Sequence, residues 1–207
     1  RQMPFDGFAI GGLAVGESKG ERESMTEFVT PFLPKDRPRY LMGVGTPIDL
    51  LEAVHRGVDM FDCILPGALG EQGVAFTYNG KVKLKRATYK FDEAPLDENC
   101  TCLTCKRHSR SYLHHLIKGE ESVGKSLITH HNIHFYLQLM RDIRESILKD
   151  EFLAFYEKYR TRLAADDEKH PIQAPKVSKK RERPTQRGAY SLVQNSQNGK
   201  FSIKHND

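Results

Sequence analysis

Apolar residues in the first 66 positions alternate between short runs and helical spacing. Short runs at 8–10, 40–45 and 58–65 predict strands, and the spacing within 21–33 and 46–57 predicts two helices. The order strand, helix, strand, helix, strand indicates parallel strands joined by right-handed crossovers. Loops after such strands gather at one edge of the sheet, where α/β enzymes carry their chemistry.

Three strands with two crossovers do not close into a stable structure on their own. The pattern therefore fits either an incomplete doubly wound sheet or the last part of a (β/α)8 barrel. The sequence also begins with Arg1 rather than with Met. From both observations we expect that the N-terminal portion of a larger domain is absent from this chain.

A period-two alternation of apolar and polar residues replaces this pattern after residue 67. Runs at 74–78 and 81–85 flank Asn79-Gly80, a dipeptide typical of a type I′ hairpin turn. In the second run, lysines alternate with apolar residues and predict one cationic face. These lysines are Lys81, Lys83 and Lys85.

Helical spacing of apolar residues returns from residue 100 to about residue 163. Stripes within 112–117, 132–149 and 151–163 predict helices whose apolar faces belong to the core. Beyond Asp166 the chain is rich in Pro, Lys, Arg, Ser, Asn and Gln, a composition that predicts disorder.

Composition limits the class of protein. Of 207 residues, 38% are hydrophobic and 29% are charged, which supports a packed core and excludes a wholly disordered chain. No apolar run approaches the roughly 18 residues of a membrane helix, and the first residues do not resemble a signal peptide. A membrane-spanning protein is therefore excluded. We expect a cytoplasmic protein because three of the four cysteines are clustered within six residues, whereas a disulfide framework would spread them out.

The net charge of +5 is unevenly distributed along the chain. Residues 1–168 contain 23 Lys and Arg against 25 Asp and Glu, whereas residues 169–207 contain 9 against 2. A second basic excess, 9 against 4, occupies residues 81–118. Such patches suit phosphate backbones, although a solvated surface and a tail that aids solubility are alternatives.

Three of the four cysteines fall within six residues. Cys100, Cys102 and Cys105 are predicted on a tight turn that opens a helix, and His131 follows at the start of the next long helix. Three thiolates and one imidazole complete a tetrahedral Zn²⁺ shell without an open position, so we expect one structural zinc. The alternatives are three buried free cysteines, or a different fourth ligand among His114, His115, His130 and His134.

A carboxylate, Asp62, is predicted near the C-terminal end of the third apolar strand. A charge there costs free energy unless it is used or paired. Such a carboxylate can act as a nucleophile at a sugar carbon and form a covalent glycosyl intermediate. The alternative is an Asp that caps the following loop. Asp59 lies nearer the start of the strand and is the poorer candidate.

A glycine-rich segment, residues 11–17, follows the first strand. Glycines allow a flat ligand to approach the backbone closely, so that N–H and C=O groups can bind a nucleobase edge. The phosphate-loop patterns GxGxxG and GxxxxGK are absent. An ordinary glycine-rich turn is the alternative.

Together these motifs resemble the tRNA-guanine transglycosylase (queuine tRNA-ribosyltransferase) family of the bacterial type. The resemblance covers about residues 1–160, in family order: GGLAVGE at 11–17, RYLMGVG at 39–45, VDMFDCILP at 58–66, and the set Cys100, Cys102, Cys105 and His131. It implies the C-terminal part of a (β/α)8 TIM barrel with an inserted zinc subdomain. The implied organisation is barrel strands and helices at 1–66, the hairpin and zinc subdomain at 67–131 and C-terminal helices at 132–165. The basic tail at 166–207, which its composition predicts to be disordered, has no counterpart in the family pattern.

The resemblance also implies an activity. The family exchanges the wobble guanine of certain tRNAs for a 7-deazaguanine base, preQ1 or queuine, in queuosine biosynthesis. Asp62 matches the nucleophile that attacks the ribose anomeric carbon, and the family is expected to form homodimers through its zinc subdomain. Residues that match base-binding or base-orienting positions are Gly12, Leu13, Ala14, Glu17 and Met42.

Two departures from the family pattern bear on function. The family usually continues Pro-Thr-Arg with a second Arg, which grip the anticodon loop, but here Pro66 is followed by residues 67–71, GALGE. Either other cations bind the RNA in their place, or RNA binding is weakened. The candidate cations are Lys81, Lys83, Lys85, Arg86, Lys106, Arg107 and Arg110. The family's other active-site carboxylates match positions upstream of residue 1, so the isolated chain can be inactive. A non-catalytic, zinc-dependent RNA-binding or companion subunit is therefore the competing hypothesis.

Overall fold

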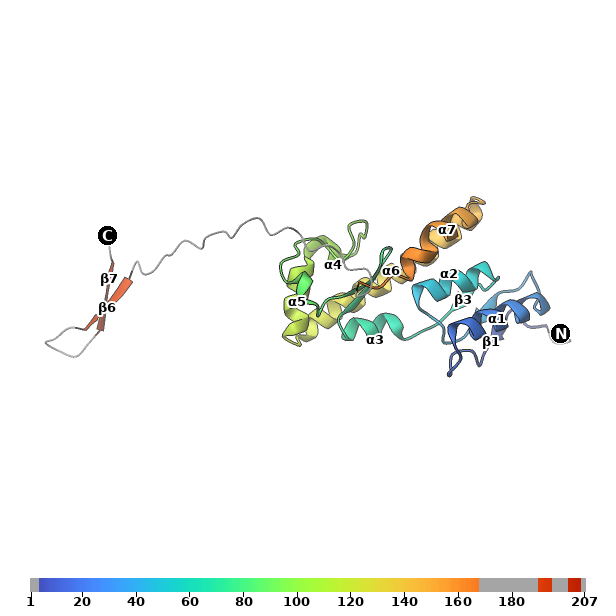
Figure 1. Ribbon diagram of the computed structural model, residues 1–207, viewed down its shortest axis with the longest axis horizontal. Coiled ribbons are helices and arrows are strands. Elements are labelled where there is room, and N and C mark those ends of the chain that lie inside the picture. The colour runs from blue at the N-terminus through green and yellow to red at the C-terminus, as the bar shows by residue number, and fades with distance from the viewer. Residues whose placement is uncertain (1–3, 168–189, 195–200, 206–207) are drawn as a thin grey trace. The chain divides into compact units, whose positions relative to one another are not determined.

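A computed structural model describes residues 4–167, 190–194 and 201–205 of the chain, which divides into two units, Arg1–Pro175 and Lys176–Asp207. The first unit contains a three-stranded sheet, a β-hairpin and the helices α1 to α7 (Figure 1). In the second unit, β6 (Tyr190–Gln194) and β7 (Phe201–His205) pair antiparallel. These two strands lie in the segment predicted to be disordered, and the rest of that prediction beyond Asp167 lies outside the described residues.

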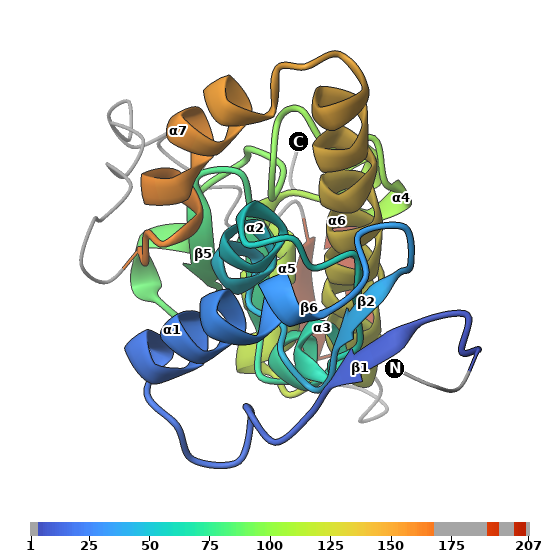
Figure 2. The ribbon, with the colours of Figure 1, turned by 90° about the vertical axis from the view of Figure 1, so that its right-hand side faces the viewer.

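The predicted strand and helix alternation is confirmed in the first 61 residues. Strands β1 (Phe8–Ile10), β2 (Arg39–Leu41) and β3 (Met60–Phe61) pair parallel in the order β1-β2-β3. Between them run α1 (Lys19–Val29) and α2 (Pro47–His55), which lie side by side (Figure 2). Side chains cap both helices at their N-termini, Ser18 with a capping box on α1 and Thr46 on α2.

The third strand is shorter than predicted, because β3 covers only Met60 and Phe61 and residues Leu65–Glu71 form helix α3. Pro66, expected to close the strand, lies in the first turn of α3, where its missing N–H removes no helical hydrogen bond. Asp62 therefore lies in the loop after the strand and not within it.

The apolar spacing located α1 but not its buried face. The helix ends at Val29 and is followed by a 3-10 turn, η1 (Thr30–Phe32). Thr26 and Thr30 are buried, because each hydroxyl donates to a carbonyl four residues earlier in the chain. Of the four apolar residues at helical spacing, three are exposed, Met25 by 47%, Phe28 by 64% and Phe32 by 58%, and only Val29 packs against the core.

The hairpin forms from β4 (Val74–Thr77) and β5 (Gly80–Lys83), as predicted, but its turn is different. Thr77 pairs with Gly80, and of the two turn residues expected at positive φ, only Gly80 has one (104°). The prediction of a type I′ turn is therefore wrong. The turn shifts because Tyr78 is held by the protein, through its N–H to Asp97 and its hydroxyl to Asp142.

Within the described residues 84–167, which follow the hairpin, a 3-10 turn, η2 (Ala87–Tyr89), is followed mostly by helices. They are α4 (Leu103–Arg107), α5 (Arg110–Lys118), α6 (Ser122–Leu148) and α7 (Phe152–Leu163). Helix α6 begins ten residues earlier than predicted, so His131 lies inside it rather than at its start. Gly124 permits this extension, because a β carbon there would lie 2.7 Å from Cβ of Leu116 on α5.

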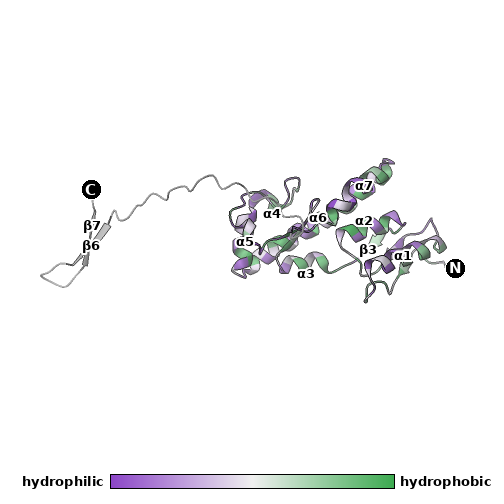
Figure 3. Ribbon diagram, viewed as in Figure 1, coloured by the Kyte–Doolittle hydropathy of each residue, from purple (hydrophilic) through white to green (hydrophobic). Residues whose placement is uncertain are grey.

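Three clusters of buried apolar side chains hold the first unit together. One lies in the parallel sheet, one joins the hairpin to α5 and the start of α6, and one joins α2 and β4 to α6 and α7. The helices carry both hydrophobic and hydrophilic residues along their length (Figure 3). Tyr112, Ile133 and Ile147, expected in the core, are instead 43%, 49% and 50% exposed. Among the described residues, no helix is both long and apolar enough to cross a membrane.

Candidate active site and metal centre

Asp62 lies at the carboxyl edge of the parallel sheet, directly after β3, and its side chain is exposed. Its Oδ1 accepts two hydrogen bonds, one from the hydroxyl of Tyr40 (2.6 Å) and one from the backbone N–H of Gly43 (2.9 Å). The bond from Tyr40 and then that from Gly43 hold the pKa of the Asp62 carboxyl below its ordinary value. The carboxylate is therefore ionised, oriented and accessible.

Strand register explains the contact between Tyr40 and Asp62. Tyr40 pairs with Met60, and Asp62 follows Met60 by two residues, so both side chains project to the same side of the sheet. Sequence reasoning did not single out Tyr40. The signal that could have found it is its place on the strand next to that of the carboxylate.

The loops after β1 and β2 touch each other at this edge. A β carbon on Gly11 would lie 3.5 Å from Sδ of Met42, and one on Gly43 would lie 3.4 Å from Cβ of Ala14. Met42 is 45% exposed. The structure thus brings residues 12–14 and Met42, all predicted to bind the base, to the same edge as Asp62.

Glu17 is placed so that it can orient the first of these loops. Its Oε2 accepts a hydrogen bond from the backbone N–H of Val15 (3.0 Å), and backbone N–H groups of the loop, its own first, lower the pKa of its carboxyl. Glu17 therefore folds back on the glycine-rich segment rather than reaching toward Asp62.

Close packing joins the loop after β2 to the loop after β3. Sγ of Cys63 lies 3.5 Å from the carbonyl oxygen of Gly45, and a β carbon on Gly45 would lie only 2.0 Å from that sulfur. Only glycine leaves room for Cys63 here. This contact places the segment that contains Asp62 against the segment that contains Gly43.

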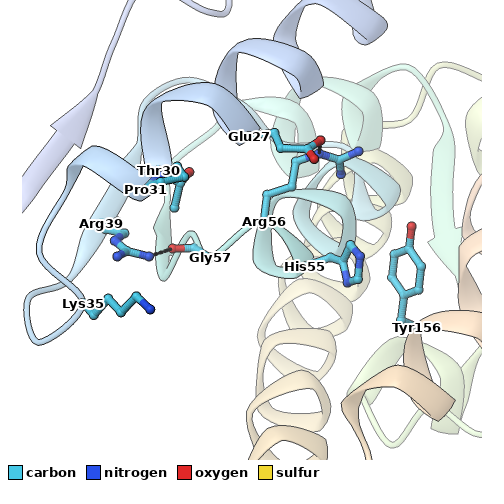
Figure 4. Close-up of a pocket in the computed structure, with 9 residues that line it drawn as sticks. All are labelled: Glu27, Thr30, Pro31, Lys35, Arg39, His55, Arg56, Gly57 and Tyr156. Atoms are coloured by element: carbon cyan, nitrogen blue, oxygen red, sulfur yellow. Dashed lines mark hydrogen bonds and ion pairs between the residues drawn. The ribbon is translucent and has the colours of Figure 1, made fainter.

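A cavity of about 570 Å³ is lined by residues that include Arg39 and Gly57 (Figure 4). Because Arg39 begins β2 and Gly57 precedes β3, the cavity lies toward the edge at which the strands begin, opposite the edge that carries Asp62. Arg39 lines it at the start of β2 and donates to the carbonyl oxygens of Gly57 (3.1 Å), Leu33 (3.0 Å) and Pro34 (3.3 Å). These bonds tie together the loops that enter the strands. The cavity therefore lies where a parallel α/β sheet carries stability rather than chemistry.

The predicted cysteine and histidine set is assembled in space. Cys102 is the N-cap of α4, and its Sγ accepts from the N–H of Cys105. Nδ1 of His131, from α6, lies 3.6, 3.5 and 3.3 Å from the sulfurs of Cys100, Cys102 and Cys105. All four ligand atoms lie within 4.8 Å of one another, so these residues can hold a metal ion.

The separations fit a tetrahedral ion. Zn–S bonds of about 2.3 Å and Zn–N bonds of about 2.1 Å at tetrahedral angles place sulfur and nitrogen about 3.6 Å apart. The thiols of Cys100 and Cys105 lower the pKa of Cys102 by hydrogen bonding, which favours a thiolate. The site thus has the ligand types and the spacing that a divalent ion of zinc type requires.

The partner of His131 on its other nitrogen is the backbone carbonyl of Phe76 in β4. Nε2 lies 2.8 Å from that oxygen and donates to it, and Nδ1 is the nitrogen that faces the sulfurs. His131 is fully buried, whereas His114 lies 2.6 Å from the carbonyl of Leu84 and His130 is exposed. The structure therefore selects His131 among the histidines that the sequence left open.

The predicted RNA-binding cations divide into two groups. The acidic pair Asp166 and Asp167, which follows α7, neutralises three of them: Lys81 and Lys83 lie 3.5 and 3.3 Å from Asp166, and Arg86 lies 3.3 Å from Asp167. Arg110 is paired with Asp92 at 3.1 Å. The exposed group consists of Lys85, Lys106 and Arg107.

Comparison with known proteins now adds to this geometry. The sequence profile of the family described as queuine tRNA-ribosyltransferase matches residues 1–165. The chain belongs to the queuine tRNA-ribosyltransferase family. Among its relatives, proteins named queuine tRNA-ribosyltransferase from Helicobacter acinonychis and Helicobacter pylori strain HPAG1 are 50% and 51% identical to it over 162 residues. One from Lactococcus lactis subsp. cremoris is 49% identical over 157 residues.

This member of the queuine tRNA-ribosyltransferase family corresponds to part of its relatives. The three alignments cover 78%, 76% and 76% of this chain, but only 44%, 44% and 41% of the respective relatives. The chain therefore spans less than half the length of the curated relatives that it matches. The family resemblance drawn from the sequence motifs is confirmed.

Proposed function

We propose that this chain is part of a tRNA-guanine transglycosylase, which exchanges the wobble guanine of a tRNA anticodon for a 7-deazaguanine base, preQ1 or queuine. The observation that carries the proposal is the exposed carboxylate of Asp62, whose Oδ1 is held by Tyr40 and Gly43. Because both bonds fall on one oxygen, Oδ2 is available to a ribose carbon. Family membership supports the same reaction.

The proposed reaction has two displacement steps. Oδ2 of Asp62 attacks C1′ of the ribose, the C1′–N9 bond breaks, and its electron pair leaves with guanine, which takes up a proton. The incoming base then gives up a proton, attacks C1′ and expels Asp62 as a carboxylate. One glycosidic bond breaks and one forms, so no energy source is required. The lowered pKa of Asp62 keeps the nucleophile ionised.

The segments beside Asp62 are proposed to bind the base. Backbone groups of Gly12, Leu13 and Ala14 would meet its polar edge, and the polarizable side chain of Met42 would pack on its face. Contact between the two loops supports this arrangement. Glu17 would orient the first loop through its bond to Val15.

We further propose that residues 1–66 are the last strands and helices of a (β/α)8 barrel. Parallel strands in sequential order, with a helix after each of the first two, support this arrangement. The exposed side chains of Met25, Phe28 and Phe32 on the α1 and η1 segment also support it, because further β/α units of a barrel would bury such a face. Residues 67–131 would form the zinc subdomain and 132–165 the C-terminal helices.

The metal is proposed to be one structural Zn²⁺ held by Cys100, Cys102, Cys105 and His131. Four protein ligands leave no position for water, so the ion would supply folding free energy and no reaction step. It would fasten α4 to α6 and, through His131, to the carbonyl of Phe76 in the hairpin.

The proposed partners are a tRNA, the 7-deazaguanine base and a second copy of the protein, in the cytoplasm. The exposed Lys85, Lys106 and Arg107 are suited to phosphate contacts. Family membership supports tRNA as the substrate. The homodimer is an expectation from the family resemblance.

Trapping of the intermediate tests the proposed activity. The full-length protein would be incubated with unmodified cognate tRNA, denatured, and analysed for a protein–RNA adduct. We expect an adduct in the native protein that is absent in Asp62→Asn and is released by added preQ1 or queuine. A folded, zinc-loaded protein that forms no adduct would exclude the transglycosylase reaction.

One observation favours a second function, that of a non-catalytic RNA-binding or companion subunit. Helix α3, which begins three residues after Asp62, has the sequence LPGALGE and contains no arginine. The family pattern has two arginines in this segment. Without these cations the anticodon loop loses bidentate contacts. Binding of tRNA without adduct formation would support this second function.

A further inference from the structure

Helix α6 contacts the loop after β2 and the start of α3, on the two sides of the Asp62 site, through two residues to which the sequence analysis gave no role in the site. Asn132 and Tyr136 lie one turn apart on the buried face of α6, next to the metal ligand His131. Their polar atoms do not bond within α6. They bond instead to segments that lie far away in the sequence.

Asn132 is fully buried and makes three hydrogen bonds. Its Oδ1 accepts from the N–H of Phe76 (3.0 Å), and its Nδ2 donates to the carbonyls of Val74 (2.9 Å) and Pro66 (3.0 Å). The first two bonds fasten α6 to β4. The third bond fixes the carbonyl of Pro66, four residues after Asp62 and in the first turn of α3. It thereby fixes the direction in which residues 62–64 enter α3.

Tyr136 fastens the other loop. Its hydroxyl donates a 2.6 Å hydrogen bond to the carbonyl of Gly45, and only 8% of the residue is exposed. Gly45 lies two residues after Gly43, whose N–H binds Asp62, and its carbonyl oxygen also lies 3.5 Å from Sγ of Cys63. Tyr136 therefore sets the position of the backbone that donates to the nucleophile.

We propose that Asn132 and Tyr136 are positioning residues for Asp62, because α6 uses them to fix the loops on both sides of the nucleophile. Asn132 acts through the carbonyl of Pro66, and Tyr136 acts through Gly45 on Gly43. The expected effect on the reaction rate rests on the proposed transglycosylase function. The expected effect on the position and pKa of Asp62 does not.

The variants Tyr136→Phe and Asn132→Asp separate this role from general stability. Tyr136→Phe removes one oxygen, and Asn132→Asp keeps the acceptor for Phe76 but removes both donors. Gln138→Ala is the matched control, because it also truncates a side chain of α6 whose bonds, to Asp142 and Arg141, stay within the helix. Zinc content and thermal unfolding establish that each variant is folded.

Two measurements then decide the inference. In ¹³C NMR titrations, with the Asp62 carboxyl assigned by comparison with Asp62→Asn, we expect its pKa to rise toward the ordinary value of about 3.9 in Tyr136→Phe and Asn132→Asp but not in Gln138→Ala. In single-turnover reactions, we expect the rate of adduct formation to fall about ten- to hundredfold while the dissociation constant for tRNA stays unchanged.

A zinc-loaded Tyr136→Phe protein whose Asp62 titration and adduct rate both equal those of Gln138→Ala would overturn the inference. If Asn132→Asp does not fold, Tyr136→Phe alone supplies this decision. Absence of an adduct in the unmodified protein would instead overturn the proposed function. The titration of Asp62 would then decide the positioning role by itself.

Discussion

Tyr40 on β2 and Asp62, in the loop directly after β3, project to the same side of the sheet, and the Tyr40 hydroxyl donates a 2.6 Å hydrogen bond to Oδ1 of Asp62. Each group shifts the pKa of the other. The bond lowers the pKa of the carboxyl, and the carboxylate raises the pKa of the Tyr40 hydroxyl. At neutral pH the phenol therefore stays protonated as a donor while Asp62 stays ionised.

Tyr40→Phe is expected to raise the pH below which the rate of adduct formation declines. The native Asp62 loses its charge only as the pH falls through a depressed pKa, and removal of the hydroxyl raises that pKa. The rate of adduct formation measured against pH should therefore decline at a higher pH in the variant. If the rate of adduct formation in a folded Tyr40→Phe protein declines at the same pH as in the native protein, the hydrogen bond from Tyr40 does not set the pKa of Asp62.

Gly45→Ala is expected to destabilise the protein by about 1–3 kcal/mol, because a β carbon would overlap Sγ of Cys63. Gly67→Ala in α3 is the matched control, since a β carbon there meets no atom within 4 Å. The control should be neutral or stabilising by up to about 1 kcal/mol. Denaturant unfolding of both variants measures the difference, and equal stabilities would show that the two loops are not tightly packed.

Cys102→Ser is expected to remove the metal and unfold the region around α4. Cys102 is a proposed zinc ligand, and because serine is itself a favoured N-cap, the effect comes from the lost metal and not from a lost cap. Elemental analysis should fall from about one zinc per chain to none, with a lower unfolding temperature. Cys63→Ser, whose sulfur lies outside the cluster, should retain the zinc. Full zinc content in Cys102→Ser would refute the ligand assignment.

Arg107→Ala and Lys83→Ala remove the same charge but should affect RNA binding differently. Arg107 is exposed, whereas Lys83 lies 3.3 Å from a carboxylate oxygen of Asp166. If Arg107 contacts a phosphate, its removal should reduce the slope of log affinity against log salt by about 0.7–0.9. The slope should change little in Lys83→Ala. Titrations of tRNA binding at several salt concentrations test this, and equal slopes for both variants would contradict it.

Much of the local structure was predictable because it depends on neighbours in the sequence. Period-two alternation identified the hairpin, apolar spacing within 46–57 identified α2, and the cysteine spacing identified three members of the cluster. Predictions failed where a tertiary contact competes with a local signal. Asn79-Gly80 did not form a type I′ turn because Tyr78 is bonded to Asp97 and Asp142.

The sequence by itself determined the family, the nucleophile candidate and the cysteines, because these are short patterns of chemically distinctive residues. Only the tertiary structure decided which groups surround them. Tyr40 reaches Asp62 across 22 residues, His131 reaches Phe76 across 55, and Tyr136 reaches Gly45 across 91. Strand register and helix packing create these hydrogen bonds, and no local pattern records which distant carbonyl or carboxylate a buried side chain will meet.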